Sequence, residues 1–163
     1  PGKWKSLVAN IAQLRQVRPD IQLRIDVVLQ AVNALNVVEL FEWADAEDIP
    51  IRLWIGRGLD QYNDFRILPL SVRREFRARF ERYFARKVNR AVAPSRENIE
   101  SILAEMEATD FSEQERRERI VNFMQFVNDM DKSRRLSFKA AAGDVYAAVA
   151  SCSGGWDPRQ RYA

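Results

Sequence analysis

Three consecutive stretches decide the fold: IQLRIDVVL at residues 21–29, NALNVVELFEWADAED at residues 33–48 and IPIRLWIG at residues 49–56. Apolar and polar residues alternate in the first and third stretches, as they do in half-buried strands. In the middle stretch, apolar residues recur at helical spacing. A strand, a helix and a strand in this order predict a parallel βαβ unit with a right-handed crossover.

The two strands of this unit are too few for a complete sheet. The rest of the sequence has no convincing strand pattern, and two parallel strands do not make a self-sufficient sheet. Parallel sheets are normally covered on both faces. A helical stripe at residues 4–17 precedes the first strand, so the order is α, β, α, β, which is typical of an α/β sheet or barrel. We therefore expect the end of a partial TIM-like barrel, truncated before Pro1.

The remaining sequence predicts helices. Apolar stripes indicate a long helix over about 72–92, two further helices after Ser95 and Ser112, and a last helix over about 138–150. Asn36 with Glu39, and Ser112 with Glu115, have the spacing of capping boxes. The predicted fold class is α/β but predominantly helical. Its expected parts are βα units at residues 1–70, a helical region at 71–150 and a flexible tail at 151–163.

Composition excludes several classes of protein. The chain has 163 residues, of which 47% are apolar, and this is enough for one folded domain. It has no histidine and one cysteine, Cys152, which excludes an internal disulfide and argues against self-contained metal or triad chemistry. No run of 18 apolar residues and no signal peptide are present. We expect a cytoplasmic protein without a membrane partner.

The turn after the first strand contains the candidate cofactor-binding or substrate-binding residues, Gln30 and Asn33. In α/β folds, ligands bind at the carboxyl ends of parallel strands, which is where this turn lies. Asn33 has two equally supported interpretations, because an Asn side chain in a turn also stabilises its own backbone. Asp60 and Asp64, four residues apart in the next loop, are interpreted as solvated charges.

The helix expected over residues 72–92 has a strongly basic face. It contains eight Arg or Lys residues and two Glu residues, an excess of six positive charges. Such a stripe is typical of a surface that meets phosphates, an acidic protein or an anionic membrane. The alternative is a solvated face whose arginines pair with acidic residues nearby, and the lack of interleaved aromatic residues weakens nucleic-acid binding. The candidate contacts are Arg73, Arg74, Arg77, Arg82 and Arg86.

Several motifs resemble one known family. The segments VVLQAVN, ELFEWADAEDI and the Leu-Pro pair before the Phe/Arg-rich helix are similar to the last part of a radical SAM barrel. The segment FVNDMDKSRRLSF is similar to the C-terminal segment of the twitch-domain radical SAM proteins. The resemblance extends over about residues 3–145. The matching positions in that segment are Phe126, Met130, Asp131, Arg134, Ser137 and Phe138.

The resemblance implies a function that this chain does not complete alone. Members of the family hold a [4Fe-4S] cluster on three closely spaced cysteines and cleave S-adenosylmethionine to a radical. These cysteines are absent here, so the resemblance implies the C-terminal part of such an enzyme, inactive by itself. Its partner would be the missing N-terminal part of the barrel or another copy of the chain. Gln30 and Asn33 would lie near the cofactor or the substrate.

Two other classes of function remain open at this stage. A basic helical module could act within a larger assembly, with an acidic protein or a nucleic acid as the partner of its Arg-rich helix. A small α/β enzyme could act through Asp, Glu, Lys or Tyr without histidine. The second alternative has the weaker support, because the sequence shows no convergent pair of such residues.

Overall fold

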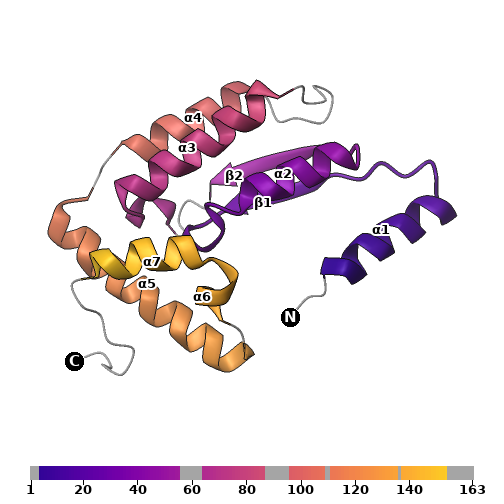
Figure 1. Ribbon diagram of the computed structural model, residues 1–163. Helices are drawn as coiled ribbons and strands as arrows, with labels where there is room; N and C mark the ends of the chain where they lie inside the picture. The colour runs from indigo at the N-terminus through magenta and orange to yellow at the C-terminus, as the bar shows by residue number, and fades with distance from the viewer. Residues whose placement is uncertain (1–3, 56–63, 87–95, 109–110, 136, 154–163) are drawn as a thin grey trace.

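A computed structural model describes residues 4–55, 64–86, 96–108, 111–135 and 137–153 (Figure 1). Within these residues the chain is predominantly helical and has one two-stranded parallel sheet. The predicted fold class is confirmed at this level. No helix in the described part of the chain is both long and apolar enough to cross a membrane.

The two strands have the predicted parallel arrangement. Strand β1 (Ile25–Leu29) pairs with β2 (Ile51–Ile55) in parallel, with Ile25 opposite Ile51 and Leu29 opposite Ile55. The predicted first strand, residues 21–29, is four residues too long. Ile25 N–H donates to Pro50 O at 2.9 Å. The chain before Pro50 turns at Asp48, which has φ of 55°, so residues 21–24 have no strand beside them.

Helix α2 (Val37–Ala46) connects the two strands and buries the apolar residues that predicted it, including Phe41 and Ala44. The short 3₁₀ helix η1 (Ala31–Asn33) precedes it. The capping box predicted at Asn36 is wrong. Asn36 has helical backbone angles and no side-chain cap, and its Nδ2 instead donates to Ala141 O at 3.1 Å. A contact with the C-terminal helices has replaced the local cap.

Helix α3 (Leu70–Ala85) is the predicted Arg-rich helix. The 3₁₀ helix η2 (Phe65–Ile67) precedes it, and Asp64 caps η2 by accepting from Arg66 N–H at 2.9 Å. The helix ends at Ala85, before the predicted end near residue 92, because the next residue, Arg86, has extended backbone angles. The predicted segment from residue 87 onward lies outside the described residues. Helix α4 (Arg96–Glu107) packs beside α3.

Helix α5 (Glu113–Arg134) begins at the predicted capping box. Ser112 Oγ accepts from Glu115 N–H at 3.3 Å, and the Glu115 carboxylate accepts from Ser112 N–H at 2.8 Å. These two hydrogen bonds satisfy backbone donors that the helix itself cannot pair. The helix ends at Arg134, and the next residue, Arg135, has a left-handed φ of 53° that stops the helix.

The last predicted helix is two helices. Helix α6 (Phe138–Ala141) and helix α7 (Gly143–Cys152) are separated at Ala142, which has φ of −145° and ψ of 57°. Ala142 is buried, and so are Phe138 of α6 and Val145 of α7. The bend at Ala142 therefore lets both short helices contact the core. Cys152, placed in the tail from the sequence, lies in the last turn of α7. The remainder of the predicted tail, residues 154–163, falls outside the described residues.

A single cluster of buried residues extends from β1 to α7 and joins the βα unit to the helical region. Its centre is aromatic: the rings of Phe41 and Phe80 meet edge to face with centroids 5.3 Å apart, and Tyr83 lies 6.0 Å from Phe41. Burial raises the pKa of Tyr83 to about 12. The α3–α4 pair lies on one side of the α2 and sheet layer, and α5, α6 and α7 form the other group (Figure 1).

Helix α1 (Trp4–Val17) stands apart from this core (Figure 1). No residue between Trp4 and Val17 is buried. The helix is held through Trp4 and Arg15: the Trp4 ring meets Trp43 of α2 with centroids 4.8 Å apart, and Arg15 donates to Glu47 O at 2.6 Å and pairs with the Glu47 carboxylate at 3.4 Å. The predicted amphipathic helix therefore exists, but most of its apolar stripe faces solvent.

Candidate functional site

The sheet has one buried face and one uncovered face. Alternate residues of each strand point to opposite faces, and the buried set is Val27, Leu29, Ile51 and Leu53, which are all less than 9% exposed. The opposite set is uncovered, with Val28 40% and Trp54 54% exposed. We call this set the open face. Its members are Arg24, Asp26, Val28, Arg52 and Trp54.

Polar contacts organise the open face around Asp26. Trp54 Nε1 donates to Asp26 Oδ1 at 3.3 Å, and Arg24 Nε donates to Asp26 Oδ2 at 3.1 Å. The hydrogen bond from Trp54 holds the pKa of Asp26 below its usual range, and Arg24 and the charge of Arg52 lower it further. Asp26 is thus an ionised carboxylate at neutral pH, bonded by an indole and one guanidinium group and influenced by the charge of a second.

The predicted residues Gln30 and Asn33 lie where β1 ends. Gln30 has extended backbone angles (φ −135°, ψ 161°), so strand alternation directs its side chain to the same side as Asp26 and Val28. Asn33 Oδ1 accepts from Gln30 N–H at 2.8 Å, and Asn33 Nδ2 donates to Val28 O at 2.9 Å. Both groups of the Asn33 amide therefore close the turn. These bonds support the turn interpretation of this residue.

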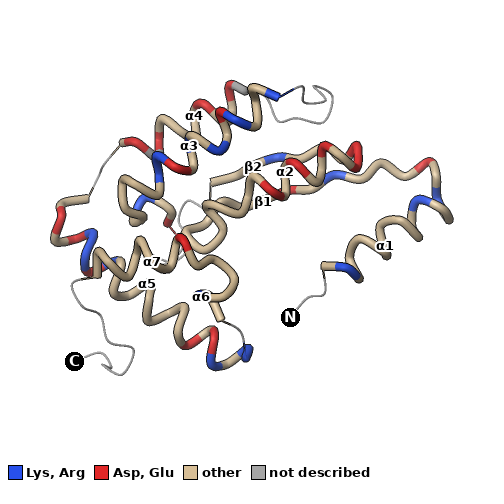
Figure 2. Tube along the Cα trace, viewed as in Figure 1, with Lys and Arg blue, Asp and Glu red and all other residues tan. Residues whose placement is uncertain are grey.

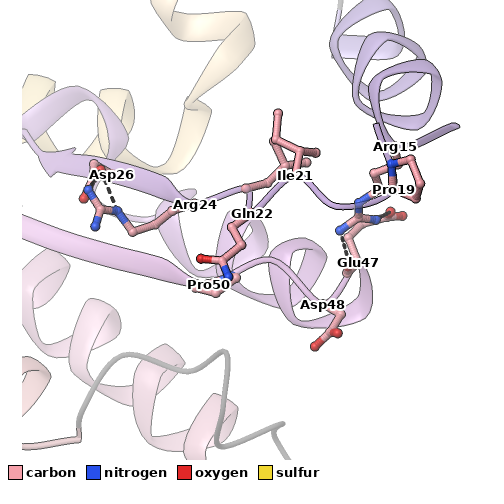
Figure 3. A pocket seen from close by; sticks show the side chains of 10 residues that line it. Arg15, Pro19, Ile21, Gln22, Arg24, Asp26, Glu47, Asp48 and Pro50 are labelled. Carbon is pink, nitrogen blue, oxygen red and sulfur yellow. Dashed lines mark hydrogen bonds and ion pairs between the residues drawn. The ribbon is translucent and has the colours of Figure 1, made fainter. Parts of the chain in front are cut away.

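A cleft of about 1020 Å³ opens at the other end of the strands, between α1 and the turn before β2 (Figure 3). Arg15 reaches across to Glu47, and Arg24 points toward Asp26, so the cleft is continuous with the open face (Figure 3). Its wall combines cationic and anionic side chains. This is the amino end of the strands, opposite the end where α/β folds bind ligands.

The candidate arginines of α3 do not form one basic surface. Figure 2 shows acidic and basic residues interleaved along α3 and α4. Arg73 is 2% exposed and lies in the core, whereas Arg74 is exposed. Arg77 Nε lies 2.6 Å from a carboxylate oxygen of Glu107.

Two further candidate arginines are also engaged. Arg82 Nη2 lies 3.0 Å from Glu75 Oε1, and Arg86 pairs with Glu42 of α2. Arg79, which was not a candidate, bonds Glu75 and also donates to Leu35 O at 2.9 Å. These contacts fit the interpretation of a solvated face with local ion pairs.

Sequence reasoning missed Asp26 and Trp54 as functional candidates. The signal was present, because strand alternation places residues 26, 52 and 54 on the polar face. Asp60, paired with Asp64 in the sequence analysis, lies outside the described residues, and Asp64 bonds Arg66. No cluster of three or more His, Cys, Asp or Glu residues that could hold a metal occurs in the part of the chain that the structure describes.

Comparisons with known proteins do not place the chain in a family: no protein-family model matches it, and neither a curated protein nor a solved structure matches it significantly.

Proposed function

We propose that this chain is the C-terminal portion of a radical SAM-like protein and completes the barrel of an S-adenosylmethionine/[4Fe-4S] radical enzyme. The observation that supports this proposal is the open face. A parallel sheet with helices on one face and an exposed Val28 and Trp54 on the other resembles a segment of a barrel wall. In that arrangement the open face would line the interior of the barrel.

The strand edges give the same proposal a second support. Ile25 N–H bonds toward β2, so the peptide groups of Asp26 and Val28 point to the outer edge of β1. Of these groups, Val28 O accepts from Asn33, and the structure shows no strand beside them among the described residues. Another parallel strand at this edge would pair them. Helix α1, with its exposed apolar stripe, would then cover the neighbouring strand as α2 covers this pair.

The residues of this chain do not fit the cluster itself. A [4Fe-4S] cluster is held by several cysteine thiolates, and the chain contains one cysteine. The cluster ligands would therefore belong to a part of the enzyme outside the chain, and we expect the chain alone to be inactive. Its own contribution would be positional. Gln30, on the open side at the carboxyl end of β1, is the better placed cofactor or substrate neighbour, because both groups of the Asn33 amide already bind the backbone.

The alternative, a binding module that acts through its Arg-rich helix, receives less support. Arg77, Arg82 and Arg86 each pair with a carboxylate, and Arg73 is buried. Binding a phosphate or an acidic protein would require breaking these pairs. Exposed pairs of this kind contribute only about 0.2–1 kcal/mol each to the stability of the fold. Their main effect here is that they reduce the positive charge that the surface presents to a partner.

The first test is to isolate the polypeptide that contains this sequence from its native cells without exposure to oxygen. We expect a polypeptide longer than 18.9 kDa, with iron and sulfide bound and with cluster absorbance that dithionite bleaches. The additional mass should lie before Pro1 and include three closely spaced cysteines. An iron-free polypeptide of 18.9 kDa would overturn the proposal.

A further inference from the structure

A second cavity shares no residue with the open face. It has a volume of about 520 Å³ and lies between the N-terminus of α3, the first half of α5 and the last turn of α7. This volume falls within the range of about 300–1,000 Å³ that is usual for small-molecule sites. The cavity is lined by Pro69, Leu70, Glu113, Arg116, Arg117, Ile120, Ser151 and Cys152.

Arg116 is the unusual member of this lining. Its Nε and Nη2 atoms are buried and have no hydrogen-bond partner among the residues that the structure describes. A guanidinium group stays charged at any physiological pH, and buried polar atoms are nearly always paired. Two of the three guanidinium nitrogens of Arg116 thus have no contact with water and, within the described part of the chain, no protein acceptor in its place.

A second guanidinium group increases the local positive charge. Arg73 of α3 is 2% exposed, and its charge and that of Arg116 interact. Burial lowers the pKa of Arg73 most, the repulsion from Arg116 lowers it further, and Glu107 acts in the opposite direction. An anion bound beside Arg116 would reduce the repulsion between these two guanidinium groups.

Other groups of the cavity are arranged to receive an anion. Helix α3 begins after Pro69, whose side chain cannot cap it, and the N–H groups of residues 70–72 precede its first internal hydrogen bond, from Arg73 N to Pro69 O. The N-terminus of a helix attracts anions through such groups. Glu113, the carboxylate on the wall, is paired with Arg117 at 2.9 Å. Its charge is therefore largely compensated already.

We propose that this cavity binds a small phosphorylated molecule, with a phosphate group between the Arg116 guanidinium and the N-terminus of α3. A phosphate carries more negative charge than one carboxylate and accepts hydrogen bonds from a guanidinium fork and from backbone N–H groups together. Leu70 and Ile120 supply an apolar wall for the remainder of the ligand. This site is independent of the proposed barrel, because none of its lining residues belongs to the sheet.

Cys152 provides a direct test because it lines the cavity and is the only cysteine of the chain. The measurement is the rate at which iodoacetamide alkylates the purified 163-residue chain, with pyrophosphate as the probe. We expect pyrophosphate to slow the alkylation and to raise the melting temperature. Citrate, a carboxylate probe of similar charge, should do so only at much higher concentration. Equal protection by citrate would overturn the assignment to phosphate.

Arg116→Gln separates a binding role from a structural one. We expect its pyrophosphate dissociation constant to rise by about tenfold or more, since charge-assisted hydrogen bonds are lost. Its melting temperature without pyrophosphate should not fall, because a buried unpaired charge has been removed. Arg134→Gln, on the exposed end of the same helix, removes the same charge and should leave binding unchanged. Absent protection of the wild-type chain, or equal protection of both variants, would overturn the site.

Discussion

At the scale of the residue, Asn33 shows how one side chain can satisfy a pattern without serving the function that the pattern suggests. Its position after a strand in a βα unit is where α/β proteins bind ligands. The structure instead shows its amide bonded to Val28 O and to Gln30 N–H. The sequence alone left these two roles equal because hydrogen bonds within a turn depend on backbone angles that no residue pattern specifies.

This assignment predicts different losses of stability in two variants. Asn33→Ala removes both hydrogen bonds and should lower the free energy of unfolding by about 1–2 kcal/mol. Asn33→Asp keeps the acceptor for Gln30 N–H and loses only the donor to Val28 O, so it should lose about half as much. Urea unfolding of the purified chain measures both values. An Asn33→Ala variant as stable as the wild type would show that the amide serves something other than the turn.

At the scale of the element, prediction succeeded where apolar periodicity alone determines the structure. Strand β2, the core of α2 and the start of α5 were predicted because alternation, helical spacing and a capping box are local features. The single helix predicted over residues 138–150 was wrong. Its bend at Ala142 brings two short helices onto a core formed by distant residues, and sequence periodicity does not encode that constraint.

The weak attachment of α1 predicts that loss of its ring contact with α2 changes stability little. Trp4→Ala loses one edge-to-face ring contact of a residue that is 47% exposed, so it should lower the free energy of unfolding by less than about 1.5 kcal/mol. Phe80→Ala, which empties a fully buried position in α3, should lower it by about 3–5 kcal/mol. Urea unfolding of both variants provides the comparison. Equal losses would mean that α1 is an integral part of the core.

At the scale of the whole molecule, the question is whether the open face is a surface or an interior. The core joins the βα unit to all the helices except α1, so the chain folds around the buried face of the sheet alone. The uncovered Val28 and Trp54 would be normal as scattered surface residues, but here they lie side by side on paired strands, opposite each other in register. Sequence patterns could predict the two strands and their parallel order, but not whether their polar face is covered, because alternation is the same for a solvated face and for a polar interior.

Adjacent positions of β1 test this difference within one strand. In the purified chain, Val28→Lys places an ammonium on the exposed face and should change the free energy of unfolding by no more than about 0.5 kcal/mol. Val27→Lys places the same group in the core and should cost about 3 kcal/mol or more.

In the polypeptide isolated from native cells, the proposal reverses the result for Val28. There, Val28→Lys would place a charge inside the completed barrel, and we expect loss of bound iron and sulfide together with a lower melting temperature. Arg52→Lys, on the same face, keeps the charge and should retain the iron. This control excludes a loss of iron that follows from any substitution on the open face. If Val28→Lys keeps the wild-type iron content and melting temperature in that polypeptide, the open face is a surface and the barrel proposal fails.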